Sequence, residues 1–115
     1  MIEIRQYIDR LGQCPFLRWL DHLSDEAQAR VARALERLEH GNLSSVKALG
    51  TGVNEIRIDF GPGYRIYFGW DGEKLVILLA GGSKKRQQDD IERAKALWRE
   101  FKGRKGRTHG TDNKL

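Results

Sequence analysis

The residues best suited to chemistry in this chain are cations that lie within or directly after short apolar segments. Arg57 and Arg65 belong to two alternating segments, and Lys84, Lys85 and Arg86 follow an apolar run. A guanidinium can donate two parallel hydrogen bonds to a phosphate, whereas an ammonium acts as a compact positive charge. The pattern favours capture of a phosphate-bearing anion if the fold brings these places together.

Other interpretations of the same residues stay open. Arg65 could instead form a cross-strand salt bridge with Asp59, worth up to about 1 kcal/mol. Residues 84–86 precede a predicted helix, whose dipole favours anions over cations at that end, so they suit either anion capture or a solvated loop. Tyr67 could stack on a base or polarise a reacting group.

Several signatures of other chemistries are missing from the sequence. No Cys and His residues have zinc spacing, and Gly50-Thr51-Gly52 lacks the third glycine of a dinucleotide loop. His22, His40 and His109 fall in predicted helices or in the tail, which disfavours a two-histidine acid–base site. The sequence therefore predicts neither a metal nor a cofactor.

Composition narrows the class of partner and the compartment. The 115 residues carry a net charge of +5 and a pI near 9.6, which favours an anionic partner, nucleic acid first, although a basic protein with no such role fits equally. Cys14 is the single cysteine, which indicates a reducing compartment. No apolar run approaches the roughly 20 residues of a membrane span, so we expect a cytoplasmic protein without a membrane partner.

Three strands are predicted in succession at residues 54–60, 64–70 and 75–80. The first two alternate, with isoleucines on one face and charged residues on the other, and the third is apolar on both faces. A tight turn at residues 61–63 predicts these pairs: Phe60 with Tyr64, Asp59 with Arg65, and Arg57 with Tyr67. A two-residue turn at Asp71-Gly72 predicts three more: Trp70 with Glu73, Tyr67 with Val76, and Arg65 with Leu78. Arg57, Arg65 and Tyr67 are then expected to share one face.

The remaining elements are predicted from caps and spacing. Pro15 begins a short helix, and Ser24 caps a second that Gly41 ends. The polar face of this second helix is expected to be a solvated surface or, as the lesser alternative, a partner-binding face. The other predicted segments are a strand at 1–7, a loop at 42–52 that contains Lys47, a helix at 87–102 that Gly103 ends, and a basic, disordered tail at 103–115.

Two stretches, EIRIDFGPGYRIYF and LVILLAGGSKKRQQDDIERAKAL, resemble the RelE/ParE superfamily of bacterial toxins. The resemblance is strongest to the HigB-like branch, often called addiction module killer proteins, and extends from Arg5 to Phe101. It implies one α+β domain at residues 1–102. The implied fold is an antiparallel sheet with the order strand, two-helix hairpin, three strands and C-terminal helix, with the helices packed on the sheet.

The resemblance also implies a function. It implies the toxin of a type II toxin–antitoxin module, acting as a metal-independent, ribosome-dependent mRNA endoribonuclease that inhibits translation and growth. The implied partners are the ribosome, mRNA and an antitoxin encoded by the adjacent gene, with a helix-turn-helix DNA-binding domain. Arg57, Arg65 and Lys84 take the catalytic positions. The residues expected to bind RNA are Lys47, Tyr67, Lys85 and Arg86.

Two alternatives remain at this point. Relatives in the ParE branch poison DNA gyrase, and a non-catalytic nucleic-acid-binding module would show the same cations. Some family members carry a tyrosine early in the final helix, whereas this chain reads RQQDDI there. The general base is likewise not identified by the sequence.

Overall fold

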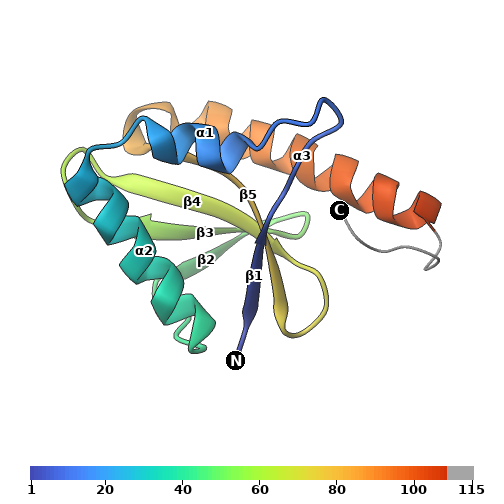
Figure 1. Ribbon diagram of the computed structural model, residues 1–115, viewed down its shortest axis with the longest axis horizontal. Coiled ribbons are helices and arrows are strands. Elements are labelled where there is room, and N and C mark those ends of the chain that lie inside the picture. The colour runs from blue at the N-terminus through green and yellow to red at the C-terminus, as the bar shows by residue number, and fades with distance from the viewer. Residues whose placement is uncertain (109–115) are drawn as a thin grey trace.

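In the part of the chain that the structure describes, five strands form one sheet and three α-helices flank it (Figure 1). The computed structural model describes the backbone of residues 1–108 and the side chains of residues 1–105. The elements in chain order are β1 (Glu3–Gln6), α1 (Pro15–Asp21), α2 (Asp25–Glu39), β2 (Val46–Gly50), β3 (Val53–Ile58), β4 (Tyr64–Trp70), β5 (Leu75–Ser83), the 3₁₀ turn η1 (Lys84–Arg86) and α3 (Gln87–Thr108). None of the described helices is long and apolar enough to cross a bilayer.

The strand order is β1-β5-β4-β3-β2, and the sheet is mixed. β1 pairs with β5 in parallel, while the other three pairs are antiparallel. The α+β class is therefore confirmed, but the prediction of an antiparallel sheet is wrong at β1. A parallel pair requires a crossover connection, and here the crossover is everything between Tyr7 and Lys74.

Each face of the sheet is covered by its own helices. α1 and α2 pack on one face through residues such as Phe16 and Leu38, and α3 packs on the other through Ala94 and Trp98. β5 contributes to both cores, as its apolar run predicted. The charged face of β3 and β4, however, is not open to water along its length, because α3 lies over part of it.

Two glycines at the end of β5 allow helices to approach from both sides. A Cβ atom on Gly81 would lie 2.1 Å from Cε3 of Trp19 in α1. A Cβ atom on Gly82 would lie 1.9 Å from Oδ2 of Asp90 in α3. Real Cβ contacts are never this short, so the Gly-Gly pair is a packing requirement at this point.

The prediction of a loop at residues 42–52 is wrong in part, because β2 forms within it. It is an edge strand that pairs with β3, and only Val46 and Leu49 of its side chains are partly buried. The intervening turn places Thr51 at φ 55° between two glycines with φ 90°. Its five residues do not alternate between buried and exposed side chains, so the hydrophobic pattern of the sequence does not indicate a strand.

The predicted register between β3 and β4 is wrong by two residues. Arg57 lies opposite Arg65, and Glu55 lies opposite Tyr67. The connection is longer than predicted, since Ile58 is already paired with Tyr64 and the turn forms within residues 59–63. A two-residue shift keeps every side chain on its predicted face but changes all of its neighbours.

The predicted register between β4 and β5 is also wrong. Trp70 lies opposite Val76 rather than Glu73, because residues 71–74 form a four-residue connection. A bulge between Tyr67 and Phe68 adds a further shift. The observed partners are Ala80 for Tyr67 and Gly82 for Arg65.

The helix signals were accurate at most ends. α1 begins at Pro15, and the Ser24 hydroxyl accepts a hydrogen bond of 3.1 Å from the backbone N–H of Ala27 at the start of α2. Gly41, with φ 82°, follows the end of α2. These short-range rules depend only on neighbouring residues, which explains their success.

The predicted end of the last helix is wrong, since α3 continues through Gly103 to Thr108. Arg104 Nη1 donates to the Tyr7 hydroxyl at 3.1 Å and to the Ile8 carbonyl at 2.8 Å, and Lys105 pairs with Asp71. Burial raises the pKa of Tyr7 to about 12. These tertiary contacts outweigh the helix-breaking tendency of one glycine. The rest of the predicted tail, residues 109–115, lies outside the described residues.

The course of α3 predicts the effect of Gly103→Ala. No atom outside the helix lies within 4 Å of a Cβ at Gly103, so alanine fits there without a clash. Alanine is expected to stabilise the fold by about 0.5–1 kcal/mol, because it loses less conformational entropy than glycine when the helix forms. Gly69→Ala is the contrasting variant, because its Cβ would lie 2.5 Å from Cζ3 of Trp98. Thermal unfolding measures both, and a lower melting temperature for Gly103→Ala would contradict a helix at that position.

Candidate nucleic-acid interface

The three cations predicted to be catalytic come from segments that meet at one end of the sheet. Arg57 in β3 is the cross-strand partner of Arg65 in β4, and Arg65 is paired with Gly82 in β5, two residues before Lys84. The backbone N–H of Lys84 donates to the Gly63 carbonyl at 3.0 Å, which attaches the start of η1 to the β3–β4 turn. The predicted convergence is therefore present at the level of the backbone.

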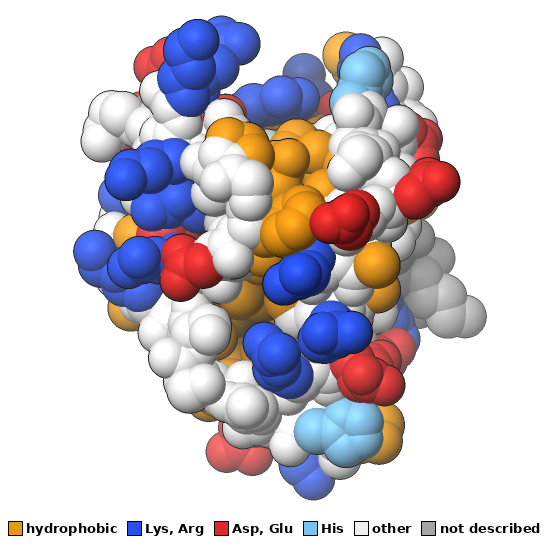
Figure 2. Space-filling model, turned by 90° about the vertical axis from the view of Figure 1, so that its left-hand side faces the viewer, with side chains coloured by type: hydrophobic (Ala, Val, Ile, Leu, Met, Phe, Trp, Pro, Cys, Tyr) orange, Lys and Arg blue, Asp and Glu red, His pale blue; other side chains and the backbone are white. Residues whose placement is uncertain are grey.

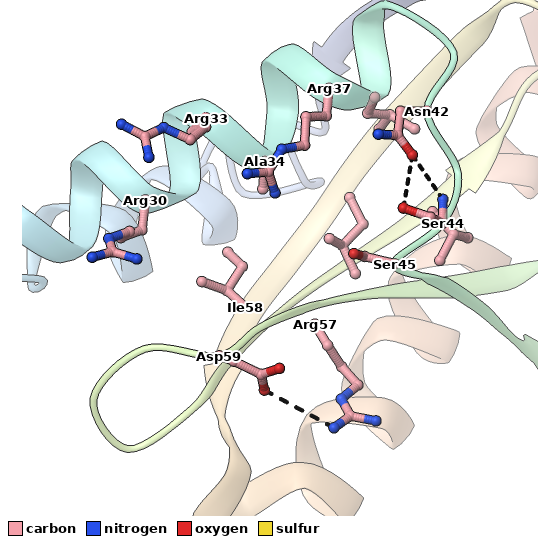
Figure 3. Close-up of a pocket in the computed structure, with 13 residues that line it drawn as sticks. Arg30, Arg33, Ala34, Arg37, Asn42, Ser44, Ser45, Arg57, Ile58 and Asp59 are labelled. Atoms are coloured by element: carbon pink, nitrogen blue, oxygen red, sulfur yellow. Dashed lines mark hydrogen bonds and ion pairs between the residues drawn. The ribbon is translucent and has the colours of Figure 1, made fainter.

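Arg57 and Lys84 are exposed at this end of the sheet. The Arg57 side chain is 58% exposed, and its closest acid is Asp59, with Nη2 and Oδ1 4.0 Å apart. Figure 3 shows the Arg57 side chain leaving its strand on the side away from α2. A pair this long and this exposed contributes little energy, so a phosphate can compete for the guanidinium.

Arg65 differs from the other two cations because it is buried and paired. Its side chain is 10% exposed, and its Nε atom lies 2.9 Å from Oε1 of Glu55, whose side chain is 1% exposed. The N–H does not point along that line, so the contact is an ion pair rather than a hydrogen bond. The alternative prediction, that Arg65 forms a salt bridge with Asp59, is therefore wrong, since Asp59 lies next to Arg57 instead. With 10% of its side chain exposed, Arg65 offers an outside anion less surface than Arg57, which is 58% exposed.

Gln87, at the start of α3, supports the same pair. Its Nε2 atom donates to Oε1 of Glu55 at 3.0 Å. The buried carboxylate thus contacts Arg65 of β4 and Gln87 of α3, in the low-dielectric space between the helix and the sheet. This contact ties the beginning of α3 to the strands that carry the cations.

Tyr67 lies in the same buried layer, with 0% of its surface exposed. Its hydroxyl has no hydrogen-bond partner among the described residues. Burial raises its pKa strongly, and the nearby Glu55 and Asp90 carboxylates raise it further. The prediction that Tyr67 binds RNA directly is therefore corrected: α3 covers the ring, and no base can reach it here.

The other predicted RNA-binding residues are exposed. Lys47 lies on the edge strand β2, and Lys85 and Arg86 lie in η1 beside Lys84. The 3₁₀ turn precedes α3 itself, whose first turn carries Asp89 and Asp90. The conflict between these cations and the helix dipole is thereby relieved, because the helix proper begins with acids.

The Asp90 carboxyl marks where α3 closes over the strand end. It packs against Gly82, and burial raises its pKa, while Arg86 lowers it in part. Arg86 is itself exposed in η1. All three cations of η1 are thus open to an outside anion.

Sequence reasoning missed two features of this end of the molecule. One is Glu55, which the sequence shows only as part of a charged face; because it lies on the same face of the strand as Arg57, it is a candidate partner for Arg65. The arginines of α2 were assigned to a solvated surface, yet Arg30, Arg33 and Arg37 line a hollow of about 240 Å³ between α2 and β3 (Figure 3). Their spacing of three and four residues on one helix face was the available signal.

Among the described residues, no group of three or more His, Cys, Asp or Glu side chains is arranged to hold a metal ion. The chemistry that the site can offer from its own side chains is electrostatic. Exposed guanidinium and ammonium groups can bind an anion and stabilise negative charge that develops on it.

Comparison with known proteins places these features in a family. The sequence model described as phage derived protein Gp49-like (DUF891) matches residues 18–99. An uncharacterized protein of Haemophilus influenzae (strain ATCC 51907 / DSM 11121 / KW20 / Rd) is 42% identical over 87 residues, which cover 75% of this chain and 88% of the relative. The residues that match the family model include α2, the strands from β2 to β5 and the first part of α3. The chain therefore belongs to the phage-derived Gp49-like family, whose members are commonly toxins of toxin–antitoxin modules related to the RelE and HigB-like toxins.

Proposed function

We propose that this chain is a toxin that cleaves mRNA on the ribosome and so inhibits translation and growth. The observation that carries the proposal is the convergence of exposed Arg57 and Lys84, from distant parts of the chain, at the end of the sheet. Family membership supports the toxin class. The net charge of +5 supports a polyanionic substrate.

The proposed cleavage needs no group outside the RNA as nucleophile. The ribose 2′-oxygen loses its proton and attacks the adjacent phosphorus, and the bond from phosphorus to the 5′-oxygen breaks. The 5′-oxygen takes up a proton, leaving a 2′,3′-cyclic phosphate and a 5′-hydroxyl. Arg57 and Lys84 stabilise the charge on the non-bridging and departing oxygens, and the ribosome holds the strand in attack geometry.

Arg65 receives a different role from the one its sequence position suggested. Because Glu55 and Gln87 occupy its surroundings, we assign it as a positioning residue that fixes β3 and β4 beneath Arg57. Its pairing with Glu55 and its 10% exposure favour this structural role over direct contact with the RNA. This assignment separates one buried cation from the exposed cations that act on RNA.

An antitoxin is part of the proposal. A toxin of this kind requires a protein that neutralises it, and we propose that the adjacent gene encodes one. Expression of the chain alone is expected to stop growth, and co-expression of the neighbouring gene product is expected to restore it. Growth arrest that persists with the neighbour present would remove that gene as the antitoxin.

Substitution of the exposed cations tests the proposed chemistry. Arg57→Ala and Lys84→Ala are each expected to reduce mRNA cleavage by about 100- to 1000-fold, because each removes one donor to the developing charge. Lys102→Ala, on the exposed face of α3, is the matched control and should cleave like wild type. Inducible expression followed by mapping of transcript ends provides the measurement.

The same experiment separates the alternatives. Breaks in phase with codons support the proposal, whereas DNA breaks with intact mRNA would identify a gyrase poison. Unaltered growth and intact transcripts would contradict any toxin activity. Full cleavage by both Arg57→Ala and Lys84→Ala would reject the assigned residues.

The buried pair provides an independent prediction. Arg65→Ala leaves Glu55 buried without its cation and is expected to cost about 3–5 kcal/mol of stability, whereas the double variant Glu55→Gln, Arg65→Gln recovers most of it. If Arg65 only positions the strands, the refolded double variant keeps measurable cleavage. A double variant as stable as wild type but as inactive as Lys84→Ala would instead make Arg65 catalytic.

A further inference from the structure

The hollow between α2 and β3, which we term the α2 groove, carries unbalanced positive charge. It is lined by Arg30, Arg33 and Arg37 of α2 and by Arg57, with a single acid, Asp59. Figure 2 shows this side of the molecule, where Lys and Arg side chains gather on both sides of a narrow hydrophobic strip. The three α2 arginines lie along one rim of the hollow, while the Arg57 guanidinium leaves the floor on the side away from α2, so together they form a positive border that attracts an anion (Figure 3).

The α2 arginines are not neutralised by the protein itself. Within the described part of the chain, Arg30, Arg33 and Arg37 form no ion pair with any carboxylate. Glu26 stands four residues before Arg30, a spacing that favours a helical pair. Arg30 instead lies over the Phe60 ring, 4.5 Å from its centroid, which fixes the guanidinium at the mouth of the groove.

Neutral donors complete the lining. Asn42 uses its Oδ1 atom to accept from the Ser44 N–H at 3.0 Å and the Ser44 hydroxyl at 2.8 Å, so its side-chain amide hydrogens stay available. Ser45, the next residue along, also lines the groove. Arginine, asparagine and serine side chains are the usual donors to phosphate and sugar oxygens of nucleic acids.

The floor of the groove disfavours a peptide as the occupant. Its apolar side chains are already covered, with Leu38 1%, Ile56 3% and Ile58 8% exposed. A protein segment needs an open apolar pocket for its anchoring residues, and this floor provides little of one. Recognition here must depend on charge and hydrogen bonds from the rim.

We propose that the α2 groove binds the phosphate backbone of the RNA strand next to the cleavage site, an inference that rests on the proposed function. Arg57 belongs both to the groove and to the sheet end that carries Lys84, so one strand can pass from the catalytic cations into the groove. Arg33 and Arg37 bind phosphates there without touching the reacting atoms. The contacts read the backbone and not the bases.

Salt-dependent binding of a non-cleavable strand tests this inference. The probe is a fluorescently labelled single-stranded 2′-O-methyl RNA, which lacks the attacking hydroxyl. Arg33→Gln combined with Arg37→Gln is expected to make the plot of log K against log salt less steep by about 1.4, at roughly 0.7 per lost phosphate contact, and to weaken binding about tenfold at low salt. A DNA strand of the same sequence should lose the same slope.

The matched control removes two charges from the opposite face. Arg99→Gln combined with Lys102→Gln, both exposed on α3, is expected to keep the wild-type slope. If both double variants lose the same salt slope, the effect comes from net charge alone and the inference is overturned. A loss of slope for RNA but not for DNA would also overturn it, and so would a wild-type protein that binds neither strand. Unchanged RNA binding with lost binding of an acidic peptide would assign the groove to a protein partner instead.

These experiments distinguish a failure of the proposed cleavage from a failure of the groove inference. If transcripts stay intact in cells while the groove variant loses its salt slope, the proposed cleavage is wrong but the groove still binds nucleic acid. If wild type cleaves and the groove variant keeps its slope, the groove inference alone is wrong. Circular dichroism on each variant confirms that the comparison concerns folded protein.

Discussion

Strand β5 sends Val76 and Leu78 into the core beneath α1 and α2, and Ile77 and Leu79 into the core beneath α3. Burying each such side chain contributes about 1.5–3 kcal/mol, so neither face of this strand can be left open. The double cover fixes where the helices lie. It also requires the glycine pair at the strand's end, where Trp19 and Asp90 press in from opposite sides.

Coverage by α3 divides the cations of the sheet into two kinds. Beneath the helix, Arg65 and Glu55 are withdrawn from water and compensate each other. Beyond its beginning, Arg57 and Lys84 remain in water, where an anion can reach them. The position at which α3 starts, set by Gln87 and η1, thus decides which positive charges serve the fold and which can serve a ligand.

Much of this arrangement was predictable from local pattern. The alternation in 54–60 and 64–70 predicts two strands and their faces, and Ser24 predicts a helix start, because each signal depends on adjacent residues. The convergence of Arg57, Arg65 and Lys84 at one end follows from strand order alone. A register that is wrong by an even number of residues, as between β3 and β4, still places these side chains on the correct face of the sheet.

What could not be predicted depends on distant contacts. Gly103 reads as a helix end until Arg104 is seen to reach Tyr7, nearly a hundred residues away in sequence. Glu55 becomes the partner of Arg65 only because the connection at 59–63 is longer than the turn residues suggest. The exposure of each cation, and therefore its possible role, depends on a helix whose docking the sequence does not encode locally.

The parallel pairing of β1 with β5 has a consequence for the order in which the protein is made. Translation produces β1 first, yet its partner residues Leu75 to Leu78 emerge only after two helices and three other strands. Closing so long a loop slows folding, and the sheet face that α3 covers stays bare until that helix follows. A nascent chain therefore lacks the joined strand ends on which the proposed activity depends until most of its residues have been synthesised.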